Sequence, residues 1–432
     1  MFRVEKVLVV VLIAVLAGVL MYECLTPTGF LYPYLHREEE APEHRRRLPF
    51  GLFDTASKVA DSNSEWATAW VNQRKTFFDG DYFWVFYYYG YAPEVDPDYP
   101  YIYYAVSSQD GFSWSNPQGV VRRADIDYMY LGQGIDVRWD ATLNKAIMSI
   151  PYNYYFYWAR VGTSNGVLTR EVLRCPLVYA GFYVVAPRHS YIEDYVLCYH
   201  QAVDPLNSFK RGDVIAYSVR DVDAGTPQAG LTSAGPFGTY SDVNGGSLTL
   251  RYDKDTAIYV VKDGDNTLHW GFMNKTFITF PPISLETELS PGLNSLSGCE
   301  TELDSGIINQ HIVYIKFTGE LCYRRFENDV WSGETVLVEK GASYPVIAAG
   351  GGGRLYVFYV FNGVIKLLKF DGEKWLKNQV QDAFPFHTYN NPAYLSTNQV
   401  VQHGKICLVW TERNLVHGEK PYAVWFGYIE DG

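Results

Sequence analysis

The sequence predicts an all-β protein, and three observations lead to this class. Aromatic residues make up 16% of the 432 residues, and such side chains favour pleated, half-buried strands. Hydrophobic residues make up 47% and charged residues 19%, which is enough apolar material for a large core and excludes a disordered chain. Between Ala60 and Gly432 no stretch shows a convincing amphipathic helical pattern.

An internal repeat predicts the architecture. The segment ending at Trp331 aligns without a gap over the segment ending at Trp375, and this alignment places Gly319 over Gly363. Each copy reads as an apolar strand, a glycine turn, a second apolar strand, another turn and a tryptophan. Units of about 40 to 45 residues with four short strands are typical of propeller blades. The sequence therefore predicts a β-propeller.

The number of blades follows from further copies of this unit. Residues 83–114 form a clear copy, and weaker copies begin near Lys145, Tyr195, Ala257 and Lys405. We predict about seven four-stranded blades, with six as the alternative because the second and third are poorly marked. Closing the ring removes exposed strand edges. We therefore expect a strand just after the linker, such as residues 66–72, to complete the blade formed by residues 406–410 and 423–428.

The N-terminal segment predicts a membrane anchor. Residues 7–22 carry no charge and follow Arg3 and Lys6, while residues 21–23 offer no small-residue cleavage site. We expect residues 1–25 to form a retained transmembrane helix. The preceding positive charges place the rest of the chain outside, on a cell or virion surface. Residues 26–60, rich in proline and charge runs, are predicted to be a stalk or linker, and residues 61–432 the propeller.

Charge and composition restrict the partners. Lys and Arg number 36 against 48 Asp and Glu, a net charge of -12, so nucleic acid is not expected. The expected partners are the membrane, through the helix, and a glycan or surface protein. Asp-x-Asp pairs such as Asp253/Asp255 offer oxygen ligands for calcium, but none continues into a full loop signature. We predict no metal and no cofactor.

The cysteines allow two interpretations. Cys175 and Cys198 have the same 23-residue spacing as Cys299 and Cys322, which predicts two disulfides if the head is extracellular. The alternative is that cysteines inside apolar strand patterns are small buried hydrophobic residues, and we favour it slightly. Asn274 begins an N-K-T sequence, a glycosylation acceptor motif.

One turn resembles a known family. The segment SQDGFSW resembles the Asp-box of the bacterial neuraminidase repeat, which occurs in sialidases and related propellers, although the usual pattern has one more residue between Asp and Gly. Residues 327–331 and 371–375 are weaker copies. In such a turn the aspartate caps backbone amides, the glycine takes a conformation other residues avoid, and the tryptophan packs beneath. The matching positions are Ser108, Asp110, Gly111, Ser113 and Trp114.

The resemblance to sialidases also implies candidate catalytic residues. Arg74 matches the arginine of the opening strand that grips a sialic acid carboxylate, although Lys75 and Thr76 replace the family's Ile and Pro. Asp96 or Asp98, in the loop before the Asp-box, would be the acid/base. The nucleophile would be a tyrosine beside a carboxylate. The resemblance nominates Tyr344 or Tyr394 as nucleophile, and Glu300, Glu302 or Glu412 as the carboxylate.

Two functions follow from these observations. The first is a non-catalytic, membrane-anchored surface propeller that binds glycans or a protein partner. The alternative is a sialidase-like exo-glycosidase with a type II membrane topology. We favour the first because the arginine pattern is incomplete and a fold alone does not carry activity. In that case we expect aromatic and amide side chains, rather than an arginine cluster, to line the binding face.

Overall fold

The chain divides into two units, Met1–Arg46 and Arg47–Gly432. The computed structural model describes residues 56–90, 101–122, 135–140, 145–152, 155–175, 183–185, 196–203, 211–220, 228–236, 247–253, 256–262, 266–273, 283–286, 288–290, 294–302, 306–413 and 422–431, all in the second unit. Within these residues, no helix is both long and apolar enough to cross a membrane. The predicted anchor lies outside the described residues.

The described residues form seven antiparallel sheets, and the predicted all-β class is confirmed. The first sheet contains β2 (Thr76–Phe78), β3 (Phe83–Tyr88), β4 (Tyr101–Ser108) and β5 (Gln118–Arg122). The second contains β6 (Asp136–Asp140), β7 (Lys145–Tyr152), β8 (Tyr155–Ser164) and β9 (Val167–Cys175). The third contains β10 (Tyr183–Val185), β11 (Val196–Val203), β12 (Arg211–Arg220) and β13 (Gln228–Pro236).

The second half of the chain supplies four more sheets. The fourth contains β14 (Ser247–Arg251), β15 (Ala257–Lys262), β16 (Leu268–Met273) and β17 (Ile283–Glu286). The fifth contains β18 (Leu296–Glu302), β19 (Ile308–Ile315), β20 (Leu321–Glu327), β21 (Val330–Trp331) and β22 (Thr335–Val338). The sixth contains β23 (Ala342–Ala349), β24 (Leu355–Phe361), β25 (Val364–Phe370) and β26 (Gln381–Asp382), with short 3-10 helices η4 (Gly351–Gly353) and η5 (Lys377–Gln379). The seventh contains β27 (Ala393–Thr397), β28 (Lys405–Arg413), β29 (Tyr422–Glu430) and β1 (Ser57–Ser62).

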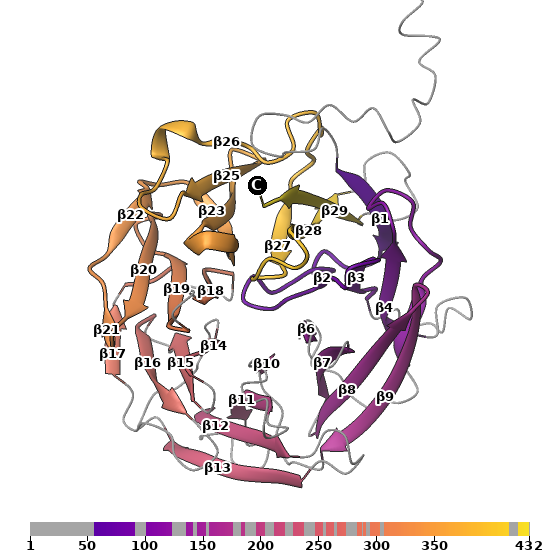
Figure 1. The fold of residues 1–432 in the computed structure, drawn as a ribbon, viewed down its shortest axis with the longest axis horizontal. Coiled ribbons are helices and arrows are strands. Elements are labelled where there is room, and N and C mark those ends of the chain that lie inside the picture. The colour runs from indigo at the N-terminus through magenta and orange to yellow at the C-terminus, as the bar shows by residue number, and fades with distance from the viewer. Residues whose placement is uncertain are drawn as a thin grey trace, which may run out of the picture. The chain divides into compact units, whose positions relative to one another are not determined.

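The seven sheets follow one another around a ring (Figure 1). The first strand of each sheet contacts the first strand of the next, in the order β2, β6, β10, β14, β18, β23 and β27, and β27 contacts β2 again. Each sheet then extends outward through its second, third and fourth strands. The repeat predicts about seven units, and this propeller-like arrangement has seven sheets, six with four strands and the fifth with five.

The strand that completes the last sheet comes from earlier in the chain than we predicted. Strand β1 pairs with β29, from Ser57 opposite Phe426 to Ser62 opposite Tyr422. The choice of residues 66–72 for this role was wrong. That segment hydrogen-bonds to itself in turns, with the amide of Ala69 donating to Trp66 O at 3.1 Å, so these groups are not available to a sheet partner.

The core lies between neighbouring sheets, and this explains the unbroken apolar strands. All six residues of β3 are buried. Alternate side chains point to opposite faces of a strand, so one set packs against the second sheet and the other against the seventh. Strand β24 divides its side chains in the same way between the fifth and seventh sheets. Such doubly covered strands read as continuous hydrophobic runs.

The 44-residue repeat places equivalent residues at equivalent positions. The Phe326 and Trp331 ring centroids are 5.2 Å apart, and those of Phe370 and Trp375 are 5.3 Å apart. Each tryptophan faces its phenylalanine in an antiparallel pair. Both tryptophans are half-buried, and each also meets a ring of the preceding sheet, Trp331 with Trp270 at 6.1 Å and Trp375 with Tyr323 at 4.9 Å between centroids.

The predicted disulfide between Cys299 and Cys322 is wrong, since both thiols are free and buried. Cys299 lies on β18 and Cys322 on β20, with β19 between them. Two strand spacings separate Cα atoms by about 9 to 10 Å, beyond the reach of a disulfide. The two side chains also pack in different core clusters. Cys175 and Cys198 lie on strands of different sheets, and their side chains are outside the described part, so that pairing stays a prediction.

Candidate functional site

The turn between β4 and β5 is built around the carboxylate of Asp110. Its Oδ1 accepts hydrogen bonds from the backbone amides of Phe112 and Ser113 at 2.7 and 2.8 Å, and from the Ser108 hydroxyl at 2.8 Å. Burial raises the pKa of Asp110, but these bonds outweigh it and the pKa is lowered. Gly111 has a φ of +76°, which favours glycine. Trp114 donates to the Ser57 hydroxyl at 3.0 Å and thus ties the turn to β1.

Arg74, the candidate ligand-gripping arginine, is buried in an ion pair. Its guanidinium donates to both carboxylate oxygens of Asp136 on β6, at 2.9 and 2.6 Å, and its backbone amide donates at 2.7 Å. The side chains are 2% and 0% exposed. The neighbouring Lys75 is also buried and donates to Gln73 and to the carbonyl of Ile135. Burial lowers the pKa of Lys75 to about 7.

Two further arginines surround Glu300 on β18. Arg138 on β6 approaches its carboxylate at 3.6 Å, and the backbone amide of Arg251 donates to it at 2.6 Å. The guanidinium of Arg251 binds Glu302. Burial lowers the pKa of Arg74, but Asp136 and, to a smaller extent, Glu300 outweigh it and the pKa is raised. Each of these three guanidinium groups therefore faces a carboxylate of the same chain. We call Arg74, Lys75, Asp136, Arg138 and Glu300 the first-strand charge cluster.

The candidate tyrosines lie side by side near the starts of β23 and β27. Their ring centroids are 5.1 Å apart in an edge-on contact. Burial, followed by Tyr344 and Glu65, raises the pKa of Tyr394 to about 12. Burial and Glu65 also raise the pKa of Tyr344. These surroundings hold the phenolic protons in place, whereas a nucleophile must lose its proton.

The candidate carboxylates for activating a tyrosine contact other groups, and the candidate acid/base residues lie outside the described part of the chain. The described contacts of Glu300 and Glu302 are with arginines, and those of Glu412 are with His387, Trp410 and Asn390. Asp96, Asp98 and Asn274 lie outside the described residues. Among the residues that are described, no group of three or more His, Cys, Asp or Glu side chains could hold a metal ion.

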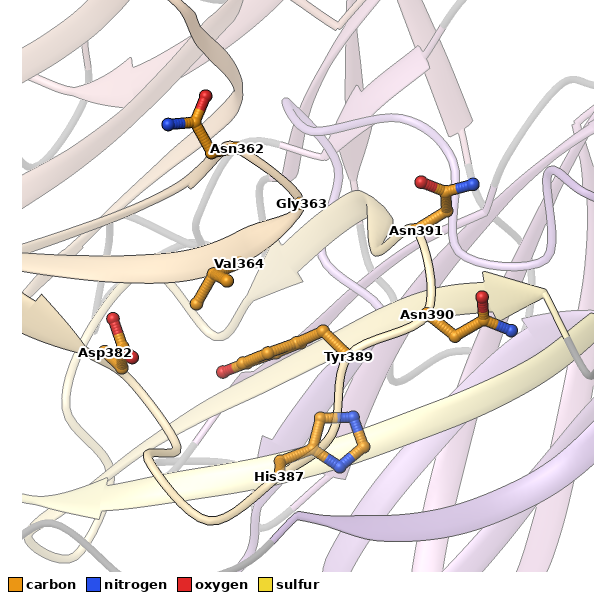
Figure 2. Close-up of a pocket in the computed structure, with 8 residues that line it drawn as sticks. All are labelled: Asn362, Gly363, Val364, Asp382, His387, Tyr389, Asn390 and Asn391. Atoms are coloured by element: carbon orange, nitrogen blue, oxygen red, sulfur yellow. The ribbon is translucent and has the colours of Figure 1, made fainter.

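A polar pocket of about 440 Å³ lies beside the sixth and seventh sheets. Its walls come from the hairpin between β24 and β25, from Asp382 on β26, and from the connection that leads into β27 (Figure 2). Figure 2 shows the Tyr389 ring extending from this connection toward Val364 and Asp382. We call this the Tyr389 pocket, and its lining residues are Asn362, Gly363, Val364, Asp382, His387, Tyr389, Asn390 and Asn391.

A buried histidine–glutamate pair fixes the floor of this pocket. His387 Nε2 and Glu412 Oε1 are 2.8 Å apart, and their side chains are 6% and 2% exposed. Trp410 Nε1 donates to the same carboxylate at 2.6 Å, and the backbone amide of Asn390 donates at 3.1 Å. The His387 ring packs between aromatic rings, including Trp425 at 4.5 Å. These contacts fix the position of the connection at His387 and Asn390. Asn391 is the next residue along the chain.

The sequence did not point to the residues of this pocket. The sequence predicts aromatic and amide side chains on a binding face, which stays a prediction, and this pocket carries three asparagines and Tyr389. The available signals were the Asn362-Gly363 dipeptide, which favours a tight hairpin, and the N-N-P sequence before β27. Neither signal reveals that a hairpin of one sheet faces the connection that leads to the next.

Comparisons with known proteins show the fold. No family model and no curated protein matches the chain. The chain is similar to a polysaccharide lyase of family PL25, an ulvan lyase, with a TM-score of 0.55 and 10% identity over 89% of this chain and 96% of that one. It is also similar to the NanB sialidase of Streptococcus pneumoniae (TM-score 0.42, 11% identity, 89% and 71% covered) and to the SapL1 lectin (TM-score 0.43, 10% identity, 69% and 94% covered). The likeness to the lyase indicates a shared fold.

Proposed function

We propose that residues 56–431 form a seven-bladed β-propeller of the sialidase-like type that binds glycans without cleaving them, through the Tyr389 pocket. The observation that carries the proposal is the lining of this pocket. Amide, imidazole, phenol and carboxylate groups can each accept or donate hydrogen bonds to sugar hydroxyls, and an aromatic ring forms one wall. Concave sites with a few fixed polar groups are the usual form of small-ligand sites.

Binding of the full chain to an array of glycans tests this proposal. We expect a set of glycans to be bound and the double change Asn362→Gly with Asn391→Gly to remove the binding. Both residues have a φ of 50°, so glycine keeps the backbone conformation and removes only the side chain. Asn328→Gly is the matched control, because Asn328 also has a φ of 50° but lies in the turn between β20 and β21. Binding that survives the double change would contradict the assignment to this pocket.

A sialidase-like exo-glycosidase is the second candidate, and one observation favours it. Arg74, Tyr344 and Tyr394 all lie at or just before the beginning of the first strand of their sheets. Hydrolysis of a fluorogenic sialoside by the full chain, lost in Tyr394→Phe or Tyr344→Phe, would establish this activity. The neutralised arginines and the raised tyrosine pKa values support the non-catalytic function instead.

We also propose that residues 1–25 remain attached as a membrane anchor and hold the propeller outside, on a cell or virion surface. The uncharged run at residues 7–22 and the basic residues before it support this topology. N-terminal sequencing of the mature protein tests it, and a terminus between residues 14 and 35 would contradict it. A mass shift on enzymatic deglycosylation, lost in Asn274→Gln, would place the head outside independently.

A further inference from the structure

We infer that the Tyr389 pocket takes an uncharged sugar residue and rejects acidic sugars such as sialic and uronic acids. This inference rests on the proposed function and adds the chemical class of the ligand. Four observations support it: the charges around the pocket, its exposed amide groups, one exposed aromatic residue, and the pairing of three arginines on or beside the first strands of the sheets with carboxylates of this chain.

The charges around the pocket oppose an anionic ligand. Asp382 lines the pocket and forms an ion pair with Lys366 at 2.5 Å, with side chains 40% and 27% exposed. Below the floor, the Glu412 carboxylate is 2% exposed. None of the eight lining residues is an arginine or a lysine. Because Lys366 already matches the charge of Asp382, a ligand carboxylate would find no unmatched cation among the lining residues and would lose its hydration without gaining an ion pair.

The amide groups suit hydroxyl groups. The side-chain amide of Asn390 donates to the carbonyl of Arg413 and is thus held in place. Asn362 and Asn391 are exposed, and no hydrogen bond of their side chains is recorded within the described part of the chain. An amide offers an acceptor oxygen and two N–H donors side by side. Adjacent sugar hydroxyls, each both donor and acceptor, match this pair of functions without any net charge.

An exposed aromatic residue directly precedes His387, one of the lining residues of the pocket. Phe386 directly precedes His387 on the connection that carries Tyr389, and it is 64% exposed. A ring exposed this far loses the stabilisation that burial would give. The C–H face of a pyranose ring is apolar and flat enough to cover such a ring, while the hydroxyls at its edge reach the amides. We therefore assign Phe386 as a stacking residue for the same sugar.

The arginines that could bind an acidic sugar are already paired with carboxylates of this chain. The guanidinium groups of Arg74, Arg138 and Arg251 face Asp136, Glu300 and Glu302. Glu300, which is 7% exposed, lies close to the first two and accepts from the backbone amide of the third. The carboxylate that these arginines bind is therefore an internal one, and an acidic sugar would have to displace it.

The experiment measures binding of the full chain to methyl glycosides of neutral hexoses and deoxyhexoses, and to sialic acid and glucuronic acid glycosides, at 0.05 and 0.5 M NaCl. We expect neutral glycosides to bind with an affinity that changes little with salt, because an uncharged ligand is not subject to screening. Asn391→Gly should weaken this binding roughly tenfold, and Phe386→Ala roughly three- to tenfold. Phe317→Ala is the matched control, because Phe317 is 73% exposed on the loop between β19 and β20, and it should leave the affinity unchanged.

The remaining outcomes separate the inference from the proposed function. Binding of acidic glycosides that is lost in Asn391→Gly would overturn the inference and leave glycan binding by the pocket intact. Binding of neutral glycosides that Asn391→Gly and Phe386→Ala do not affect would overturn the assignment of this pocket. Failure of every glycoside to bind, with a folded protein by circular dichroism, would overturn the proposed function itself.

Discussion

The first-strand charge cluster and the Tyr389 pocket use polar side chains in opposite ways. In the cluster, full charges are buried and matched within the chain, as the 2% and 0% exposures of Arg74 and Asp136 show. In the pocket, amide groups with no net charge stand open to solvent at Asn362 and Asn391. Buried charges must be paired within the protein, whereas neutral amides exposed to solvent need no partner in the protein. The difference indicates that the arginines connect sheets, and it is consistent with our proposal that the amides recognise a sugar.

Breaking the buried Arg74–Asp136 ion pair should give the largest change in stability among the tests of this contrast. Asp136→Asn should lower the free energy of unfolding by about 3–5 kcal/mol, because it leaves the Arg74 charge buried and unmatched. Urea unfolding followed by circular dichroism measures this change. The double variant Arg74→Met with Asp136→Leu should recover most of the loss, since it removes both charges together. A loss below about 1 kcal/mol in Asp136→Asn would contradict a structural role for the pair.

The pH dependence of stability tests the cluster through Lys75. Its pKa is lowered to about 7 in the folded protein by burial, while an unfolded lysine titrates near 10.4. Between these values the unfolded chain binds more protons, so stability should rise with pH. Relative to Lys75→Met, the free energy of unfolding should rise by up to about 1.4 kcal/mol per pH unit between roughly pH 7.5 and 9.5. Parallel pH profiles for the two proteins would show that Lys75 is not shifted.

A substitution in the Tyr389 pocket should do the reverse of one in the first-strand charge cluster: it should weaken binding and leave the stability nearly unchanged. Asn391→Gly should weaken glycan binding roughly tenfold, about 1.4 kcal/mol, and change the free energy of unfolding by less than about 0.5 kcal/mol. Isothermal titration and urea unfolding of the same preparation measure both quantities. A large loss of stability in this variant would remove the distinction between a binding region and a structural one.

An exposed ion pair gives the smallest effect and sets the baseline. Lys58 and Asp61 on β1 form a pair at 2.7 Å with side chains 31% and 32% exposed. Lys58→Met should cost at most about 1 kcal/mol, and added salt should reduce even this, because solvent screens exposed charges. If Lys58→Met costs as much free energy of unfolding as Asp136→Asn, burial does not explain the strength of the Arg74–Asp136 pair.

The fold could be predicted from local pattern because its unit is local. Six of the seven sheets are each one stretch of chain folded back on itself, so their strands and turns are encoded within about 40 to 55 residues. Prediction was less accurate for contacts between residues that lie far apart in the sequence. Strand β1 joins the last sheet across the whole length of the chain, and the alternation in residues 57–62 was less conspicuous than the apolar residues 66–72. The Cys299 and Cys322 spacing suggested a bond, but the intervening β19 separates them.

The sequence by itself determined the β class, the presence of a repeating unit and the Asp110 turn, because these follow from composition and short-range spacing. Only the tertiary structure decided which polar groups are available for function. Arg74 and Asp136 are 62 positions apart in the chain, and the Tyr389 pocket arises where the Asn362 hairpin of one sheet faces the connection to the next. Charge neutralisation and concavity are properties of groups brought together in space, and residue spacing along the chain does not report them.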